Sequence, residues 1–155
     1  MDTRPRILIC DDEPLMVESI KALLGGGTYR IQTTNSPRHA LSLIHAESPD
    51  LVILDVMMPG MTGFEVLDAI DRERCETAFI IVTGEASVDS AIKAIRKGAS
   101  DYLRKPFEPE ELIIRVENVL KQRQMQHDHM CVKAENRQLE NQLRQSQKME
   151  AIGTL

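Results

Sequence analysis

The sequence predicts a three-layer α/β fold for roughly the first 120 residues, with helices on both faces of a parallel sheet. Three features lead to this prediction. Five short apolar runs alternate with longer stretches that have helical spacing. Two of the runs, LVIL and AFIIV, are apolar throughout, as strands are when helices cover both sides of a parallel sheet. Gly or Pro marks several of the boundaries between the segments.

The apolar runs are too short to be independent helices, and each is followed by a helical stretch. The first, RILIC, is compact and apolar apart from its leading arginine. The second is more polar, and the fifth is the shortest. Strands are therefore expected at Arg6–Cys10, Tyr29–Thr34, Leu51–Leu54, Ala78–Val82 and Asp101–Leu103.

The helical stretches begin and end with recognisable signals. Gly25–Gly27 ends the first, and Gly98 ends the fourth. Ser36 is an N-cap and Pro37 occupies the first helical position of the second. Helices are therefore expected at Pro14–Leu24, Pro37–Glu47, Gly63–Arg74 and Ser87–Lys97, and from Pro109 onward.

The composition changes after Leu120, where the chain becomes rich in Gln and charged residues. A 4-3-4 spacing there is typical of a coiled-coil seam, formed by Val132, Asn136, Leu139 and Leu143. Asn136 would set register and oligomer state, and a stutter is expected around 127–131. Because so polar a helix is not stable alone in water, we expect it to pair with a second copy.

Charge and cysteine usage exclude several classes of protein. The net charge of −5 argues against a nucleic-acid surface. No apolar run approaches the ~20 residues that span a bilayer, and no signal peptide is visible. The cysteines Cys10, Cys75 and Cys131 lack paired spacing, which indicates reduced thiols in a cytoplasmic protein. We expect Cys10 in the core, Cys75 on a helix surface, and the histidines at 127 and 129 on a solvated face.

Polar residues follow four of the predicted strands. Asp11 and Asp12 come after the first, Asp55 ends the third, Thr83 ends the fourth, and Lys105 follows the fifth. The carboxyl ends of parallel strands meet at one edge of the sheet, which is where ligands bind in such folds. We therefore expect these side chains to converge.

Three converging carboxylates would repel one another unless a cation lies between them. Oxygen ligands favour Mg²⁺, with Mn²⁺ as a substitute, and such a site is suited to phosphate. A Lys and a Thr hydroxyl can bind further phosphoryl oxygens, and carboxylates are known nucleophiles in phosphoryl transfer. The combination predicts a magnesium-dependent phosphoryl site.

Over about 115 residues the chain resembles the response-regulator receiver family. The matching segments are ILICDDEP at 7–14, LVILDVMMPGMTGFEVL at 51–67, FIIVTGEAS at 79–87 and GASDYLRKPFEPEEL at 98–112. The resemblance implies a flavodoxin-like, doubly wound sheet of five parallel strands in the order 2-1-3-4-5.

The resemblance also implies a role for each residue of the site. Asp55 would be the phosphoacceptor. Asp12 would bind Mg²⁺ directly, Asp11 through water, and Met57 through its backbone carbonyl. Lys105 would pair with the phosphoryl group.

Other residues would respond to the phosphoryl group or shape the loops. Thr83 would bind it after moving inward, and Tyr102 would change rotamer into the vacated space. Pro59 and Gly60 would shape the loop after the acceptor, and Pro106 would follow a cis peptide bond that aims the lysine inward. Met57 and Glu85 occupy positions that tune hydrolysis of the acyl phosphate in this family.

The resemblance implies a phosphorelay module that accepts its phosphoryl group from the phospho-histidine of a kinase or a phosphotransfer protein. The last segment, SQKMEAIGTL at 146–155, resembles the lead into the phosphoacceptor helix of sensor histidine kinases. We therefore expect an N-terminal piece of a receiver–histidine kinase hybrid, with the receiver at 1–120 and a coiled-coil linker at 121–155. The piece would catalyse only its own phosphorylation, and helix packing would carry the switch to the kinase.

Two alternatives remain open. The chain could be a stand-alone receiver adaptor, complete at Leu155, that dimerises through its own tail. It could also be an aspartyl-phosphate phosphatase, but such enzymes need an Asp two residues after the nucleophile, where this chain has Met57.

Overall fold

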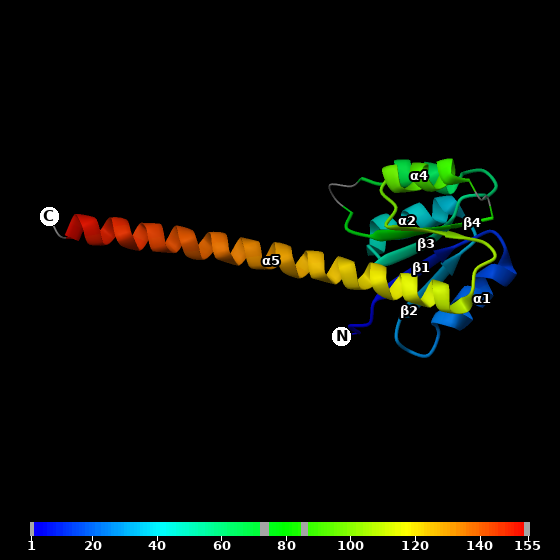
Figure 1. Ribbon diagram of the computed structural model, residues 1–155, viewed down its shortest axis with the longest axis horizontal. Coiled ribbons are helices and arrows are strands. Elements are labelled where there is room, and N and C mark those ends of the chain that lie inside the picture. The colour runs from blue at the N-terminus through cyan, green and yellow to red at the C-terminus, as the bar shows by residue number, and fades with distance from the viewer. Residues whose placement is uncertain (1, 72–74, 85–86, 154–155) are drawn as a thin grey trace. The chain divides into compact units, whose positions relative to one another are not determined.

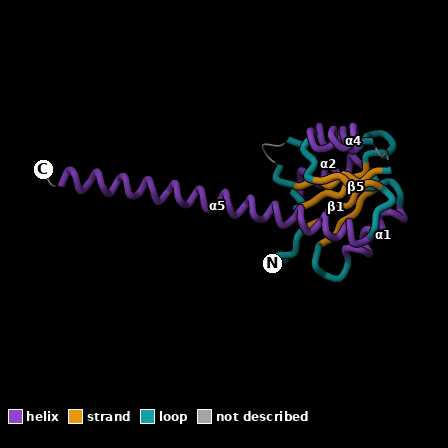
Figure 2. The backbone as a smooth tube through the Cα atoms, in the orientation of Figure 1, coloured by secondary structure: helices purple, strands orange, loops and turns teal. Residues whose placement is uncertain are grey.

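The computed structural model describes residues 2–71, 75–84 and 87–153, and the contacts divide the chain into the units Met1–Leu120 and Lys121–Leu155. The first unit contains a five-stranded parallel sheet in the order β2-β1-β3-β4-β5. Figure 2 shows the strands as a layer between helices. The predicted fold and strand order are therefore confirmed. The strands are β1 (Arg6–Cys10), β2 (Arg30–Thr34), β3 (Leu51–Asp55), β4 (Ala78–Thr83) and β5 (Asp101–Arg104).

Three helices cover one face of the sheet and two cover the other. The first face buries apolar side chains of α2 (Pro37–Glu47), α3 (Gly63–Asp68) and α4 (Val88–Arg96). The second face buries those of α1 (Pro14–Leu24) and of the start of α5 (Pro109–Gly153). Figure 1 shows α2 and α4 on the opposite side of the sheet from α1. The central strands β3 and β4 are fully buried, which explains their continuous apolar sequences.

Local signals place the ends of α1 and α2 as expected, and those of α4 within one residue of the prediction. The Ser36 hydroxyl accepts a hydrogen bond from the His39 backbone N–H at the start of α2. Gly25 caps α1, and the next two residues, Gly26 and Gly27, have positive φ angles of 113° and 86°, where a side chain would be strained. The Ser87 hydroxyl caps α4 in the same way as Ser36 caps α2.

The prediction that α3 extends to Arg74 is wrong, because the helix ends at Asp68. Its last turn tightens, with Ile70 N–H donating to the Leu67 carbonyl rather than to the residue four positions back. Cys75, expected on a helix surface, lies outside any helix and packs half-buried against the apolar cluster under α2, α3 and α4. Residues 72–74 lie outside the described part of the chain.

The second unit consists of the remainder of α5, which is helical to Gly153. Leu139 is 57% exposed in the single chain. The side chains of Val132, Asn136 and Leu143 lie outside the described part of the structure, so the coiled-coil seam stays a prediction. Within the described residues, no helix is both long and apolar enough to cross a bilayer.

Candidate functional site

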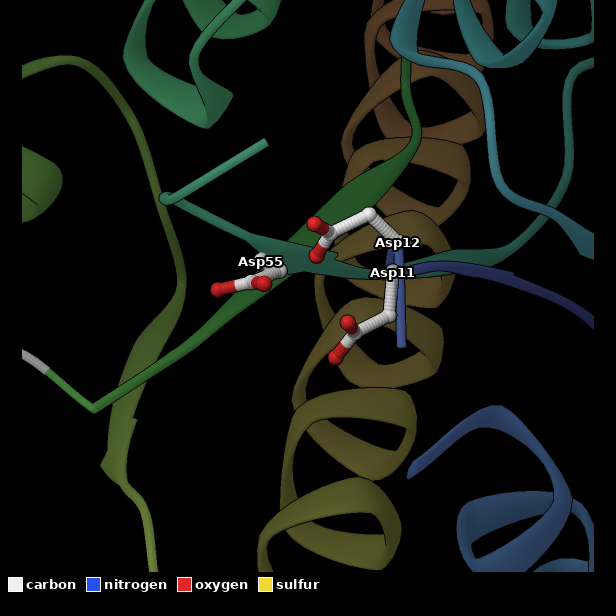
Figure 3. A group of neighbouring side chains, drawn as sticks. All are labelled: Asp11, Asp12 and Asp55. Carbon is white, nitrogen blue, oxygen red and sulfur yellow. The ribbon is translucent and has the colours of Figure 1, made fainter. Parts of the chain in front are cut away.

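Three aspartates gather where β1 and β3 end. Cys10, the last residue of β1, pairs in register with Leu54 of β3, so Asp11 and Asp55 follow on neighbouring strands at the same level. One carboxylate oxygen from each of Asp11, Asp12 and Asp55 lies within 4.8 Å of the others. Figure 3 shows the three side chains side by side. Asp11 is only 2% exposed and Asp55 only 4%, so water screens their charges little.

Lys105 is the cation of this cluster. Its Nζ lies 2.8 Å from Asp11 Oδ2 and 3.6 Å from Asp55 Oδ2, and its side chain is largely buried. Its backbone N–H donates to the carbonyl of Thr83, which places the lysine beside the end of β4. The peptide bond to Pro106 is cis, as expected from the resemblance.

The electrostatics show an excess of negative charge around Asp55. Burial raises the pKa of Asp55 to about 6, the Asp11 carboxylate adds to the increase, and Lys105 and the Met57 N–H oppose it. Burial lowers the pKa of Lys105, but the hydrogen bond to Asp11 and the charge of Asp55 outweigh it, so the net shift is upward. Three carboxylates and one ammonium group leave a net charge that a divalent cation would balance.

The donor set fits the expected metal. Each of the three aspartates offers a carboxylate oxygen, which is the ligand type that Mg²⁺ and Mn²⁺ prefer. Asp11, Asp12 and Asp55 are the residues that would hold the ion. The Met57 N–H donates to Asp55 Oδ1 at 3.3 Å, while the Met57 side chain is 62% exposed at the rim of the cluster.

The remaining predicted residues lie around this centre. Thr83 is fully buried at the end of β4, next to β3 in the sheet. Tyr102 of β5 is half-buried and packs against the apolar cluster under α2, α3 and α4. Pro59 is exposed in the loop after Asp55, and Gly60 has a φ of 83° that favours glycine. Glu85 lies outside the described residues.

Sequence reasoning missed the role of Gly63. A Cβ atom at this position would lie 2.5 Å from the Asp55 backbone carbonyl oxygen and 3.0 Å from Val56 Cα. The Gly63 N–H also donates to the Val56 carbonyl at 3.0 Å. The first turn of α3 is thus pressed against the backbone of Asp55. The sequence does contain a signal for this contact. Most residues are tolerated at the first position of a helix, so the glycine directly after the N-cap Thr62 indicates a close approach of the backbone.

A second contact that the sequence did not reveal joins Cys10, at the end of β1, to Met58. The Cys10 thiol donates to Met58 Sδ at 3.6 Å, with both side chains buried. Burial raises the pKa of Cys10 to about 12, with Asp11 and Asp55 adding to the shift. This thiol therefore remains protonated and acts as part of the core.

The comparisons with known proteins agree with this geometry. The sequence profile of the response regulator receiver domain matches residues 7–117. Response regulator SaeR of Staphylococcus aureus is 33% identical over 121 residues, which cover 78% of this chain and 53% of SaeR. The chain thus spans about half the length of the curated relatives it matches.

Solved structures show the same fold. The signal receiver domain of a putative LuxO repressor protein from Vibrio parahaemolyticus is 35% identical with a TM-score of 0.76, covering 80% of this chain and 95% of that one. A CheY-like receiver domain from Methanospirillum hungatei is 28% identical with a TM-score of 0.75, covering 80% of this chain and 99% of that one.

Proposed function

The chain belongs to the response regulator receiver family, and on this premise we propose that Asp55 accepts a phosphoryl group from the phospho-histidine of a kinase or phosphotransfer protein. The observation that carries this proposal is the group of Asp11, Asp12 and Asp55, in which Lys105 lies 2.8 Å from the buried Asp11 and 3.6 Å from the buried Asp55. An Asp55 carboxylate oxygen would attack phosphorus as the bond to the histidine nitrogen breaks, forming a mixed anhydride.

The side chains around Asp55 would have different roles in the transfer. Lys105, already aligned on Asp11 and Asp55, would bind an oxygen of the incoming phosphoryl group. Asp11 and Asp12 would hold Mg²⁺ with Asp55, and the bound ion would neutralise charge on the transferring phosphoryl oxygens. The exposed Met57, two residues after Asp55, cannot supply a proton, which disfavours a phosphatase.

The same proposal assigns a switch to Thr83 and Tyr102. Phosphorylation of Asp55 would add negative charge and three acceptor oxygens at the end of β3, and Thr83 is buried at the end of the neighbouring strand β4. Thr83 would bind one of them, and the half-buried ring of Tyr102 would turn toward the space that Thr83 leaves. The change would then reach α4, which follows Thr83 in the chain, β5, which contains Tyr102, and α5, which follows β5.

Acetyl phosphate with Mg²⁺ tests the acceptor directly. Intact-protein mass spectrometry should show one added phosphoryl group on the wild-type chain and none on Asp55→Asn. Asp50→Asn, which alters an aspartate at the opposite end of β3, is the matched control and should still be modified. Equal modification of Asp55→Asn and wild type would refute the assignment.

We further propose that α5 carries the switch from the receiver to a histidine kinase module through a dimeric coiled coil of Val132, Asn136, Leu139 and Leu143. The support is that α5 begins packed on the sheet, at Leu112 and Val116, and stays helical to Gly153. Sedimentation should show a concentration-dependent dimer of the wild type. Leu139→Lys should abolish it, whereas Gln142→Lys, at an exposed site outside the proposed seam, should not. A wild-type monomer at all concentrations would refute the coiled coil.

A further inference from the structure

Helix α4 is weakly attached to the sheet. Of its nine residues only Ala94 is buried. Its large aliphatic residues face solvent, with Val88 76%, Ile92 45% and Ile95 51% exposed. Burial of one methyl side chain contributes little free energy, and a helix of this length is marginal on its own. Other contacts must therefore account for much of its local stability.

Two lysines, one in α4 and one at its C-cap, supply such contacts, and both contact side chains of α3. Lys97, the C-cap residue, places Nζ 2.6 Å and 2.8 Å from the two carboxylate oxygens of Asp68. One turn earlier, Lys93 Nζ lies 4.6 Å from the centroid of the Phe64 ring. Lys93 and Lys97 are four residues apart, as are Phe64 and Asp68, so two successive turns of each helix meet. We call these two pairs the α3–α4 latch.

Helix α3 is a firm partner for this latch. Its N-terminus has a complete capping box between Thr62 and Glu65, and Val66 and Leu67 are buried. Its first residue, Gly63, is pressed against the backbone of the residue that we propose as phosphoacceptor. The latch therefore joins a loosely held helix to one that is fixed at the acidic cluster.

We propose that the α3–α4 latch holds α4 in place while Asp55 is unmodified and that it opens when Asp55 carries a phosphoryl group. The second half of this proposal rests on the proposed function. Thr83 ends β4 shortly before α4 begins, so a Thr83 hydroxyl drawn toward a phosphoryl group shifts the chain that enters α4. Asp68 belongs to α3 and Lys97 ends α4, so a shift of α4 that carries Lys97 Nζ more than about 4 Å from the Asp68 carboxylate breaks this ion pair.

Amide hydrogen exchange of the full chain tests the first half. In the absence of beryllofluoride, Lys97→Ala should accelerate exchange of the α4 amides roughly two- to fivefold, as expected for a partly exposed ion pair. Arg96→Ala is the matched control, since Arg96 is exposed, adjacent, of the same charge, and has no ion pair within the described residues. It should leave the exchange rates unchanged.

The contact itself is tested by the partner residue. Asp68→Ala should also accelerate exchange of the α4 amides, and the effect of the double variant should be smaller than the sum of the two single effects, because both changes remove the Lys97–Asp68 contact. Added salt should speed exchange in the wild type but not in Lys97→Ala. Wild-type exchange rates in Lys97→Ala, or fully additive effects of the two substitutions, would overturn the latch.

Beryllofluoride with Mg²⁺, followed by fluorine NMR, tests the second half. If the latch opens in the modified state, its removal favours that state, so Lys97→Ala should bind beryllofluoride more tightly by the same roughly two- to fivefold factor. Arg96→Ala should bind it like the wild type. Unchanged affinity in Lys97→Ala would overturn this half. If the wild type does not bind beryllofluoride at all, the proposed function and this half both fail, while the exchange result still decides the first half.

Discussion

Neutralising Asp55 should stabilise the metal-free protein, although Asp55 is the residue on which the proposed chemistry depends. The substitution is Asp55→Asn, studied in EDTA at pH 7.5. The wild-type carboxylate is 4% exposed and lies beside Asp11, and these surroundings raise its pKa from 3.8 to about 6. An acid whose pKa rises on folding costs stability when it is ionised.

The size of the effect follows from that pKa. A difference of about two units, at 1.36 kcal/mol per unit, corresponds to about 3 kcal/mol at a pH above both pKa values. The amide that replaces the carboxylate remains buried and polar, so we expect a gain of about 1–3 kcal/mol in the free energy of unfolding. Urea unfolding followed by circular dichroism should show a midpoint higher by about 1 M.

The pH dependence of this gain distinguishes charge repulsion from better packing. Asp55 binds its proton more tightly in the folded state than in the unfolded state. The wild type therefore loses this part of its stability as pH rises from about 4 to about 6, and lacks it entirely above pH 6. The advantage of Asp55→Asn should accordingly be largest at pH 7.5 and vanish near pH 4.

The control for Asp55→Asn is a charge removed from the protein surface. Glu18→Gln removes one negative charge from an exposed site on α1 and should change stability by less than about 0.5 kcal/mol. If Asp55→Asn is less stable than the wild type in EDTA at pH 7.5, or equally stabilised at pH 4, charge repulsion does not dominate the cluster and our electrostatic reasoning is wrong.

Three further predictions follow from the same region. Lys105→Met removes the ammonium group that contacts Asp11 and Asp55 and should lower the free energy of unfolding in EDTA by about 1–3 kcal/mol. Added Mg²⁺ should restore part of the lost thermal stability. An unchanged unfolding midpoint in EDTA would contradict the contacts of Lys105. Gly63→Ala forces a Cβ to within 2.5 Å of a backbone oxygen and should cost about 1–3 kcal/mol in urea unfolding, whereas Gly84→Ala, which meets nothing within 4 Å, should not. In a chain with the cysteines at 75 and 131 changed to Ser, Cys10 should resist a thiol reagent at pH 8 until urea unfolds the protein, because burial raises its pKa to about 12; rapid labelling of the folded chain would disprove its burial.

The sheet and its order could be predicted because the relevant signals are local or follow from the resemblance. Apolar runs of strand length, separated by capped helices, determine the α/β class, and the polar residues after each strand point to one edge. The register of Cys10 with Leu54 then brings Asp11 beside Asp55. The roles of these residues in binding metal and phosphate remain predictions.

The features that sequence reasoning missed depend on contacts between distant segments. The spacing of Phe64 and Asp68 predicts a helix, but it does not reveal that Lys93 and Lys97 lie opposite them. The end of α3 was misplaced because its apolar spacing continues to Ile70, whereas the backbone already tightens into a turn after Asp68.

The two helices that follow the acidic cluster differ in how they can respond to a change of charge at Asp55. Helix α3 starts against the Asp55 backbone at Gly63, with a complete cap and buried Val66, so displacing it would disrupt the core. Helix α4 buries only Ala94, so it can move at far lower cost. Because packed cores resist continuous deformation, a charge change at Asp55 should be expressed where packing is weakest. The structure thus predicts that α4 moves relative to α3, and that the contacts between them set how much free energy this movement requires.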